Sequence, residues 1–417
     1  MTSTSLKALP DCLEGRAPLA VRALDMERLP ELVELPVLAD GTCRYGRVLT
    51  LVRRGGLPLG WASFPVERGR ARIELDVPPA LSASTHHDGS MASGPPGPGA
   101  VGEGQLVSVV VATCAEDAAA VRCVEAILAG RCGECEVIVV ENRPGHSKVA
   151  GELRRRFSSD GRVRYVEERR PGLSSARNAG LAVARGELVA FTDDDVIVDD
   201  GWVPALRRTF ADTSVDCVTG LIAPFELESA TQLLVERFAS YGKGFEPRVY
   251  SLADPPADEP LFPYAAGHFV SGANVAFRTG TLRALGGFDE ALGTGTPARG
   301  CEDLDICIRL LLSGGCLAYE PRATVWHRHP DVPLQLRRRA FDYGASLGAL
   351  LTKHLLSRQD TGGLLRRVPQ AARYYLSPGS RRNEGRGRGF PRSLVALELA
   401  GLAAGPYLYL RSRIANR

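Results

Sequence analysis

The first ten residues, Met1 to Pro10, lack the apolar run of a secretory signal peptide. The ten cysteines are scattered from Cys12 to Cys316 and lack the spacing of a small disulfide-rich scaffold. Cys132 and Cys135 form a lone CxxC with no second pair at zinc-site spacing, which favours a structural role. These absences predict a reducing, cytoplasmic compartment.

Known phosphate-binding loops are also missing. No GxGxxG follows the first expected strand, and no GxxxxGK[ST] occurs in the chain. A bound nucleotide must therefore be held without a Rossmann dinucleotide motif or a P-loop. No internal repeat of solenoid length is present, which excludes a repeat protein.

Charge is distributed unevenly along the 417 residues, whose net charge is only +3. From Arg337 to Arg417 there are 16 Lys and Arg against 4 Asp and Glu, a local net charge of +12 that leaves −9 for the rest. A basic tail on an acidic body indicates an anionic partner, such as a membrane surface or a phosphate-bearing substrate. A solvated tail without a partner is the alternative.

Length and composition predict two or three domains with a sizeable core. Residues 1–80 form a small module with a hairpin, because 45–53 and 57–65 alternate apolar and polar residues around a glycine turn. Residues 81–104, rich in Ser, Gly and Pro, are expected to be a flexible linker. A domain over 105–335 and a helical basic region over 336–417 follow.

The domain over 105–335 alternates short apolar runs with helical patterns. This alternation predicts an α/β fold with right-handed crossovers and a mainly parallel sheet. The expected strands are 106–113, 136–140, 162–167, 187–192 and 318–325, and the expected helices are 118–129, 174–185 and 304–312.

Three of these strands end in polar residues, and ligands of open parallel sheets bind at such carboxyl ends. The acidic cluster Asp193-Asp194-Asp195 follows one of them directly. Alternation along an extended segment lets Asp193 and Asp195 face one ligand while Asp194 faces away. Carboxylate oxygens suit Mg²⁺ or Mn²⁺, and such an ion would neutralise a diphosphate leaving group. An acidic loop or helix cap is the alternative.

Shortly upstream, Pro171-Gly172 forms a turn before a helix that carries Arg177 in its first turns. Backbone donors and a cation there favour phosphate binding. Pairing of Arg177 with an acidic neighbour is the alternative.

The order of these motifs resembles that of family 2 glycosyltransferases, which adopt the GT-A fold. A strand ending in Thr-x-x-Glu, a strand ending in Glu-Asn, Gly-x-x-x-x-Arg-Asn-x-Gly and strand-Asp-Asp-Asp occur in that sequence. Downstream, 271–278, the Gly-Gly-Phe-Asp-Glu turn at 286–290 and Glu-Asp-x-Asp at 302–305 continue the pattern. The resemblance covers about 105–329.

The resemblance implies an inverting transferase that moves one sugar from a nucleotide-sugar donor to an acceptor hydroxyl. Asp303 would be the general base, and Glu302 would orient the acceptor or Asp303. The implied donor-binding residues are Thr113, Glu116, Glu141, Arg177, Asn178, Asp193 and Asp194. The implied metal ligands for Mg²⁺ or Mn²⁺ are Asp195 and Asp193, with His327 and His329 as further candidates. Gly272 and Asn274 would lie on the acceptor side.

The chain departs from the family pattern in two places that concern recognition of the nucleotide base. Ala-Thr-Cys stands where Pro-Thr-Tyr is more usual, and Glu141 stands where aspartate is common. Residues 335–339 match the Gln-x-x-Arg-Trp element of processive synthases only in part, and no set of transmembrane spans is present. Transfer of a single sugar is therefore expected.

The tail contains the 17-residue apolar run 394–410, interrupted by Glu398 and Pro406. An interfacial helix on the cytoplasmic face of a membrane and packing on the catalytic domain are both open interpretations. The basic tail favours a lipid-linked or cell-envelope acceptor, and no nucleic-acid partner is expected. The alternative functions are a sugar-1-phosphate nucleotidyltransferase and a degenerate carbohydrate-binding or scaffold protein.

Overall fold

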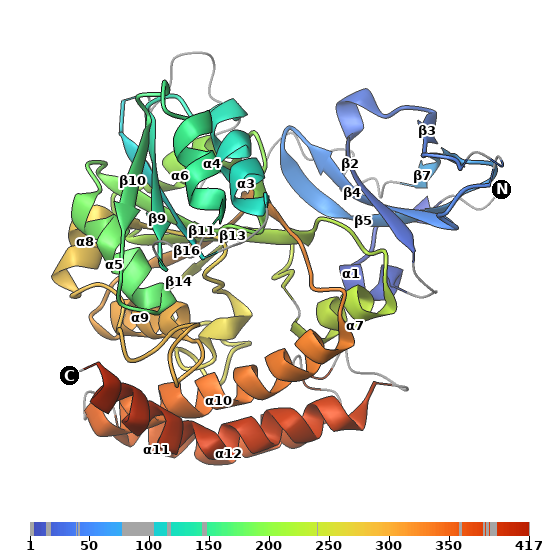
Figure 1. Cartoon of the computed structure of the whole chain (residues 1–417). Helices are drawn as coiled ribbons and strands as arrows, with labels where there is room; N and C mark the ends of the chain where they lie inside the picture. The colour runs from blue at the N-terminus through green and yellow to red at the C-terminus, as the bar shows by residue number, and fades with distance from the viewer. Residues whose placement is uncertain are drawn as a thin grey trace.

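A computed structural model gives the structure of the chain (Figure 1). It describes residues 4–13, 18–38, 40, 42–76, 104–114, 118–143, 148–239, 241–357, 361–377, 380, 383 and 390–416. The expected linker over 81–104 lies outside the described residues, except for Gly104.

The N-terminal module is built on a three-stranded sheet in the order β2-β4-β5. The predicted hairpin is present, because β4 and β5 pair antiparallel around Gly55 and Gly56, whose positive φ angles of 53° and 80° suit glycine. The elements of the module are β1 (Thr4–Ser5), α1 (Leu9–Cys12), β2 (Leu19–Asp25), a 3₁₀ turn (Met26–Arg28), β3 (Leu32–Glu34), β4 (Arg47–Arg54), β5 (Leu57–Pro65), β6 (Arg70–Arg72) and β7 (Leu75–Asp76).

The module packs directly on the larger domain. The backbone N–H of Leu19 at the start of β2 donates to Leu227 O at 2.9 Å. Apolar side chains of the module, including Leu51 and Trp61, share one buried cluster with Leu221 and Leu227 of the larger domain. The burial of this apolar surface joins the two parts.

The larger domain is organised around a nine-stranded sheet in which β10-β9-β8-β11 run parallel, followed by β15-β13-β16-β12, with β14 beside β16. The expected α/β fold with a parallel core is confirmed; the second half of the sheet is mixed, because β15, β12 and β14 run antiparallel to their neighbours. The strands are β8 (Val107–Thr113), β9 (Cys135–Glu141), β10 (Val163–Glu167), β11 (Leu188–Asp193), β12 (Val196–Val198), β13 (Cys217–Pro224), β14 (Arg248–Tyr250), β15 (Val275–Arg278) and β16 (Leu317–His327).

Helices cover both faces of this sheet (Figure 1). Side chains of α3, α4 and α6 pack in one buried cluster, and those of α5 and α9 pack in another. The helices are α3 (Ala119–Ala129), α4 (Lys148–Arg156), α5 (Leu173–Val183), α6 (Trp202–Phe210), α7 (Ala230–Ala239), α8 (Thr279–Ala284) and α9 (Glu302–Leu312), with a 3₁₀ turn at Ala266–His268. This arrangement buries the strands on both faces, as their continuous apolar sequences require.

Three helices form the C-terminal region: α10 (Pro333–Ser357), α11 (Thr361–Leu376) and α12 (Arg392–Ala415). The helices α10 and α12 lie side by side along the outer edge of the molecule (Figure 1). Glycines allow this close contact, because a Cβ on Gly405 would lie 2.5 Å from Gly348 Cα. In length and composition α12 is sufficient to cross a membrane, and 28% of its most apolar window is buried in the protein.

Candidate active site

The strand ends identified from the sequence meet at one edge of the sheet. Thr113 pairs in register with Glu141, and Ala112 pairs with Asp193. Thr113 and Glu141 are both buried, and Glu141 Oε2 accepts from Arg154 Nη2 at 3.4 Å. Glu116 lies outside the described residues.

The acidic cluster divides as alternation predicts. Thr113 Oγ1 donates to Asp194 Oδ2 at 2.6 Å, which holds Asp194 against β8. Asp193 and Asp195 instead face His327, and one ligand atom from each of the three lies within 4.8 Å of the others. Two carboxylates and an imidazole are a donor set that divalent transition metals accept.

The ionised form of the Asp195 carboxyl group is electrostatically unfavourable. Burial, together with the charges of Asp193 and Asp194, raises its pKa to about 7, although Arg339 opposes the rise. Like charges held this close disfavour ionisation unless a cation offsets them. The residues therefore fit a divalent cation.

Hydrogen bonds orient His327 toward this cluster. His329 Nε2 lies 2.6 Å from Glu236 Oε2, so this nitrogen donates to the carboxylate. His329 Nδ1 then accepts from His327 Nδ1, 3.1 Å away, and His327 Nε2 keeps its lone pair, 3.5 Å from Asp195 Oδ1. Burial and the neighbouring His329 lower the pKa of His327 well below its usual range, which keeps the ring neutral. Of the two histidine candidates, His327 faces Asp193 and Asp195, whereas His329 bonds the opposite ring nitrogen of His327.

Arg177 is buried and connects the acidic cluster to α9. Its Nη1 donates to Glu302 Oε1 at 2.9 Å, and its Nη2 donates to Asp193 Oδ1 and to Gly272 O, both at 3.0 Å. The ion-pair alternative is therefore the observed one, and the guanidinium is 2% exposed rather than open to a phosphate. Arg177 sets the relative positions of Asp193 and Glu302.

Two further candidates, Asn178 and Asn274, form hydrogen bonds within the protein. Asn178 Nδ2 donates to Phe288 O at 2.9 Å and Asn178 Oδ1 accepts from Phe288 N at 2.9 Å, which fixes the Gly-Gly-Phe-Asp-Glu turn. Asn274 is fully buried; its Oδ1 accepts from Trp202 Nε1, and its Nδ2 donates to Leu221 O and Ala323 O. Both amides are used to join strands and turns.

Glu302 and Asp303 begin α9, opposite the acidic cluster. Burial raises the pKa of Glu302 to about 7 against the lowering effect of Arg177, and the charge of Asp303 adds to the rise. Asp303 is only half-buried, and its Oδ2 accepts from Gly272 N at 2.6 Å. A Cβ at Gly272 would lie 2.7 Å from Arg177 Nη1, so a larger residue here would displace the guanidinium.

Arg339 on α10 is a site residue that the sequence reasoning missed. Its charge acts on Asp195 and Asp193, and no carboxylate among the described residues forms an ion pair with it. Its Nη1 lies 3.4 Å from Tyr241 Oη, and the Tyr241 ring stacks on His329. Helical spacing could have indicated it: Arg339 lies three residues after Leu336, and Leu336 is buried, so both side chains are on the inner face of the helix.

Parts of this chain are similar in sequence to known proteins. A pre-mycofactocin glycosyltransferase of Mycobacterium tuberculosis is 35% identical over 187 residues, which are 44% of this chain and 36% of that protein. The succinoglycan biosynthesis protein ExoM of Rhizobium meliloti is 28% identical over 228 residues, 52% of this chain and 65% of its own. The chain thus spans about a third of the first relative and about two thirds of the second.

A solved mannosyltransferase, PcManGT from Pyrobaculum calidifontis, in complex with GDP-Man and Mn²⁺, is 17% identical with a TM-score of 0.45, and the match covers 74% of this chain and 86% of that one. Residues 108–285 match the model of the family described as glycosyl transferase family 2. This range contains Arg177, Asp193 and Asp195. The resemblance expected from the motif order is therefore confirmed over residues 108–285, which match the glycosyl transferase family 2 model.

Proposed function

We propose that the protein is an inverting glycosyltransferase that moves one sugar from a nucleoside-diphosphate sugar to an acceptor hydroxyl. The observation that carries this proposal is the link through Arg177, which joins the cluster of Asp193, Asp195 and His327 to Glu302 at the start of α9. A donor end and an acceptor end thereby belong to one site.

Each end has its own chemistry. Asp193, Asp195 and His327 would hold Mg²⁺ or Mn²⁺, which when bound neutralises charge on a diphosphate leaving group. Asp303, half-buried and held by Gly272 N, takes the proton of the acceptor hydroxyl as general base. Arg339 supplies a guanidinium to the phosphates, a group that favours bidentate phosphate contacts.

The function is tested by incubating the full chain with a panel of nucleotide sugars, with Mn²⁺, with Mg²⁺ and with EDTA. We expect release of nucleoside diphosphate from at least one donor only when metal is present. Asp195→Ala should lower this rate about 10²–10³-fold, because it removes a carboxylate that the cation and the leaving group depend on. Release of pyrophosphate from a nucleoside triphosphate and a sugar 1-phosphate would instead identify a nucleotidyltransferase.

The same assay tests whether Arg339, and not the adjacent Arg338, contributes to donor binding. Arg339→Ala should raise the donor KM about 10- to 100-fold, the loss of one hydrogen bond to a charged group. Arg338→Ala is the matched control, because Arg338 is exposed on the same helix and should leave KM unchanged. Equal effects of the two changes would contradict the role of Arg339.

We also propose that the C-terminal region contacts an anionic membrane. The outward face of α12 carries Leu399, Ala403, Tyr407 and Leu410, all exposed, and no charged residue stands between Leu399 and Leu410. Arginines occur at both ends of the helix: Arg392, Arg411 and Arg413. An apolar stripe between basic ends matches the layers of a lipid interface, and such a surface supports a lipid-linked or cell-envelope acceptor.

Vesicle flotation of the full chain tests this contact. We expect binding to phosphatidylcholine vesicles that contain phosphatidylglycerol and weaker binding to phosphatidylcholine alone. Tyr407→Asp should abolish flotation, because it places a charge in the middle of the exposed stripe, whereas Val249→Asp, the same substitution at an exposed apolar residue on β14, should not. Equal flotation of the two variants, or none by the wild type, would overturn the membrane contact.

A further inference from the structure

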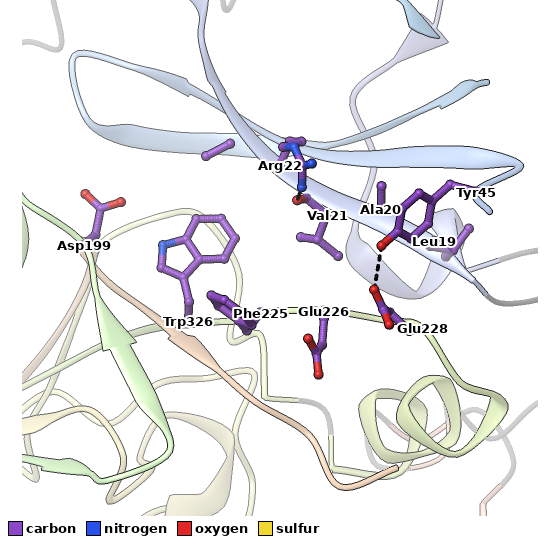
Figure 2. A pocket seen from close by; sticks show the side chains of 11 residues that line it. Leu19, Ala20, Val21, Arg22, Tyr45, Asp199, Phe225, Glu226, Glu228 and Trp326 are labelled. Atoms are coloured by element: carbon purple, nitrogen blue, oxygen red, sulfur yellow. Dashed lines mark hydrogen bonds between the residues drawn. The ribbon is translucent and has the colours of Figure 1, made fainter. Parts of the chain in front are cut away.

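A groove between the N-terminal module and the larger domain is lined by the residues in Figure 2, and none of them belongs to the donor or acceptor end. Its volume is about 410 Å³, within the range of about 300–1,000 Å³ that is typical of ligand pockets. One wall is the start of β2, and the other is formed by the ends of β13 and β16 and the chain that follows β13. Because Leu19 N bonds Leu227 O at one end of the groove, and Arg53 Nη1 bonds Asp199 Oδ2 at 2.6 Å, its two walls are tied together.

Two aromatic rings face this groove. Trp326 is half-buried and Phe225 is 39% exposed, and both point toward β2 in the close view (Figure 2). Phe225 N bonds His327 O at 2.9 Å, which places the two aromatic residues at adjacent strand ends. The fold leaves this aromatic surface open, although burial of aromatic rings is strongly favourable.

Carboxylates line the same groove, and each is already paired with an arginine. Glu228 lies 2.8 Å from Arg44 and also accepts from Tyr45 Oη. Asp199 is paired with Arg53, and Glu226 lies 3.5 Å from Arg328, whose guanidinium stacks 5.3 Å from the Phe225 ring centre. These ion pairs offset the three carboxylate charges, and Arg22, which also lines the groove, donates from Nη1 to Val21 O at 2.8 Å, so the groove does not favour a free amine. The carboxylate oxygens retain lone pairs that can accept hydroxyl protons.

We propose that this groove binds a neutral oligosaccharide. The C–H faces of pyranose rings pack on Trp326 and Phe225, and sugar hydroxyls donate to the oxygens of Glu226 and Glu228. Apolar rings with a few convergent polar groups are the composition that orients a small ligand. That the bound oligosaccharide is an acceptor or a product chain rests on the proposed function.

The groove and the donor end share strand β16. Trp326 lines the groove, and the next residue, His327, belongs to the metal cluster on the other side of the strand. A glycan in the groove is thus held beside the domain that carries the transfer chemistry, without occupying the metal cluster.

Tryptophan fluorescence gives a direct test on the full chain, in EDTA and without a nucleotide sugar. Trp61 and Trp202 are buried, so acrylamide quenching reports mainly on Trp326. Neutral tetrasaccharides of glucose, mannose and galactose, each in α- and β-linked form, are titrated. We expect at least one to lower the quenching constant by about half, with a Kd on the order of 0.1–1 mM for so open a site.

Two variants locate the binding. Phe225→Ala and Glu226→Gln should each raise Kd at least about fivefold, or about 1 kcal/mol, while Val249→Ala, an exposed apolar side chain on β14 outside the groove, should leave Kd unchanged. No protection by any tetrasaccharide, or protection that survives both groove changes, would overturn the proposal. Because the assay contains neither metal nor donor, its outcome is independent of whether the protein transfers sugar.

Discussion

Replacing Asp303 by asparagine is expected to lower the rate of sugar transfer about 10²–10⁴-fold, the contribution of a positioned general base. Asparagine keeps the size of the side chain and, with its one acceptor oxygen, can keep one of the two backbone hydrogen bonds that Asp303 accepts, from Leu304 N at 2.8 Å or from Gly272 N at 2.6 Å. It cannot take the proton of the acceptor. The donor-binding residues are unchanged, so the donor Kd should stay within about twofold.

The matched control for this change is Asp305→Asn on the same helix. Asp305 is fully buried, with Lys353 Nζ 2.6 Å and Arg309 Nε 2.8 Å away, so its loss should lower thermal stability. Transfer rate and donor Kd are measured together with melting temperature for both variants. If Asp303→Asn retains near-normal turnover, or loses donor binding to the same extent as turnover, Asp303 is not the base.

Removing the Arg177 guanidinium should destabilise the fold in a pH-dependent way. The native pKa of Glu302 is about 7, above the ordinary value of 4.5, so the native state holds a proton that the unfolded state releases between these values. Stability therefore falls as pH rises through this window. Without Arg177 the pKa of Glu302 rises further, because a charge that lowers it is gone, and the loss continues to higher pH.

We expect Arg177→Met to cost about 3–5 kcal/mol at pH 8, where a buried carboxylate is left without its partner, and clearly less at pH 5. Urea unfolding at both pH values measures this difference. Adding Glu302→Gln to Arg177→Met should recover part of the loss at pH 8, since the amide needs no counter-charge. A cost that is equal at both pH values and insensitive to Glu302→Gln would show that packing alone accounts for the role of Arg177.

Motif order and strand ends could be predicted from the sequence because both depend on local patterns. The continuous apolar runs before Thr113, Glu141 and Asp193 identify strands that are buried on both faces, and parallel pairing brings their ends to one edge. Alternation alone predicted that Asp193 and Asp195 face together while Asp194 turns away.

The roles of Arg177 and Asn178 could not be predicted in the same way. Their partners lie far along the chain: Glu302 is 125 residues from Arg177, and Phe288 is 110 residues from Asn178. A local motif identifies which residues occur together, but the three-dimensional fold decides which neighbour neutralises each charge. The contact of the N-terminal module with the larger domain depends on pairs even farther apart in the sequence, such as Tyr45 with Glu228, which are 183 residues apart.

Because α10 is one continuous helix, it connects the donor cluster to the α12 surface that is proposed to contact a membrane. One end of the helix brings Arg339 to the aspartate cluster, and the other end brings Lys353 to within 2.8 Å of Asp289. The glycine contact fastens α12 along this same helix. A membrane that touches α12 would therefore hold the donor cluster at a fixed distance from the bilayer and at a fixed tilt. A membrane-anchored acceptor would then be selected by the length of the segment between its anchor and its sugars, as well as by the sugars themselves.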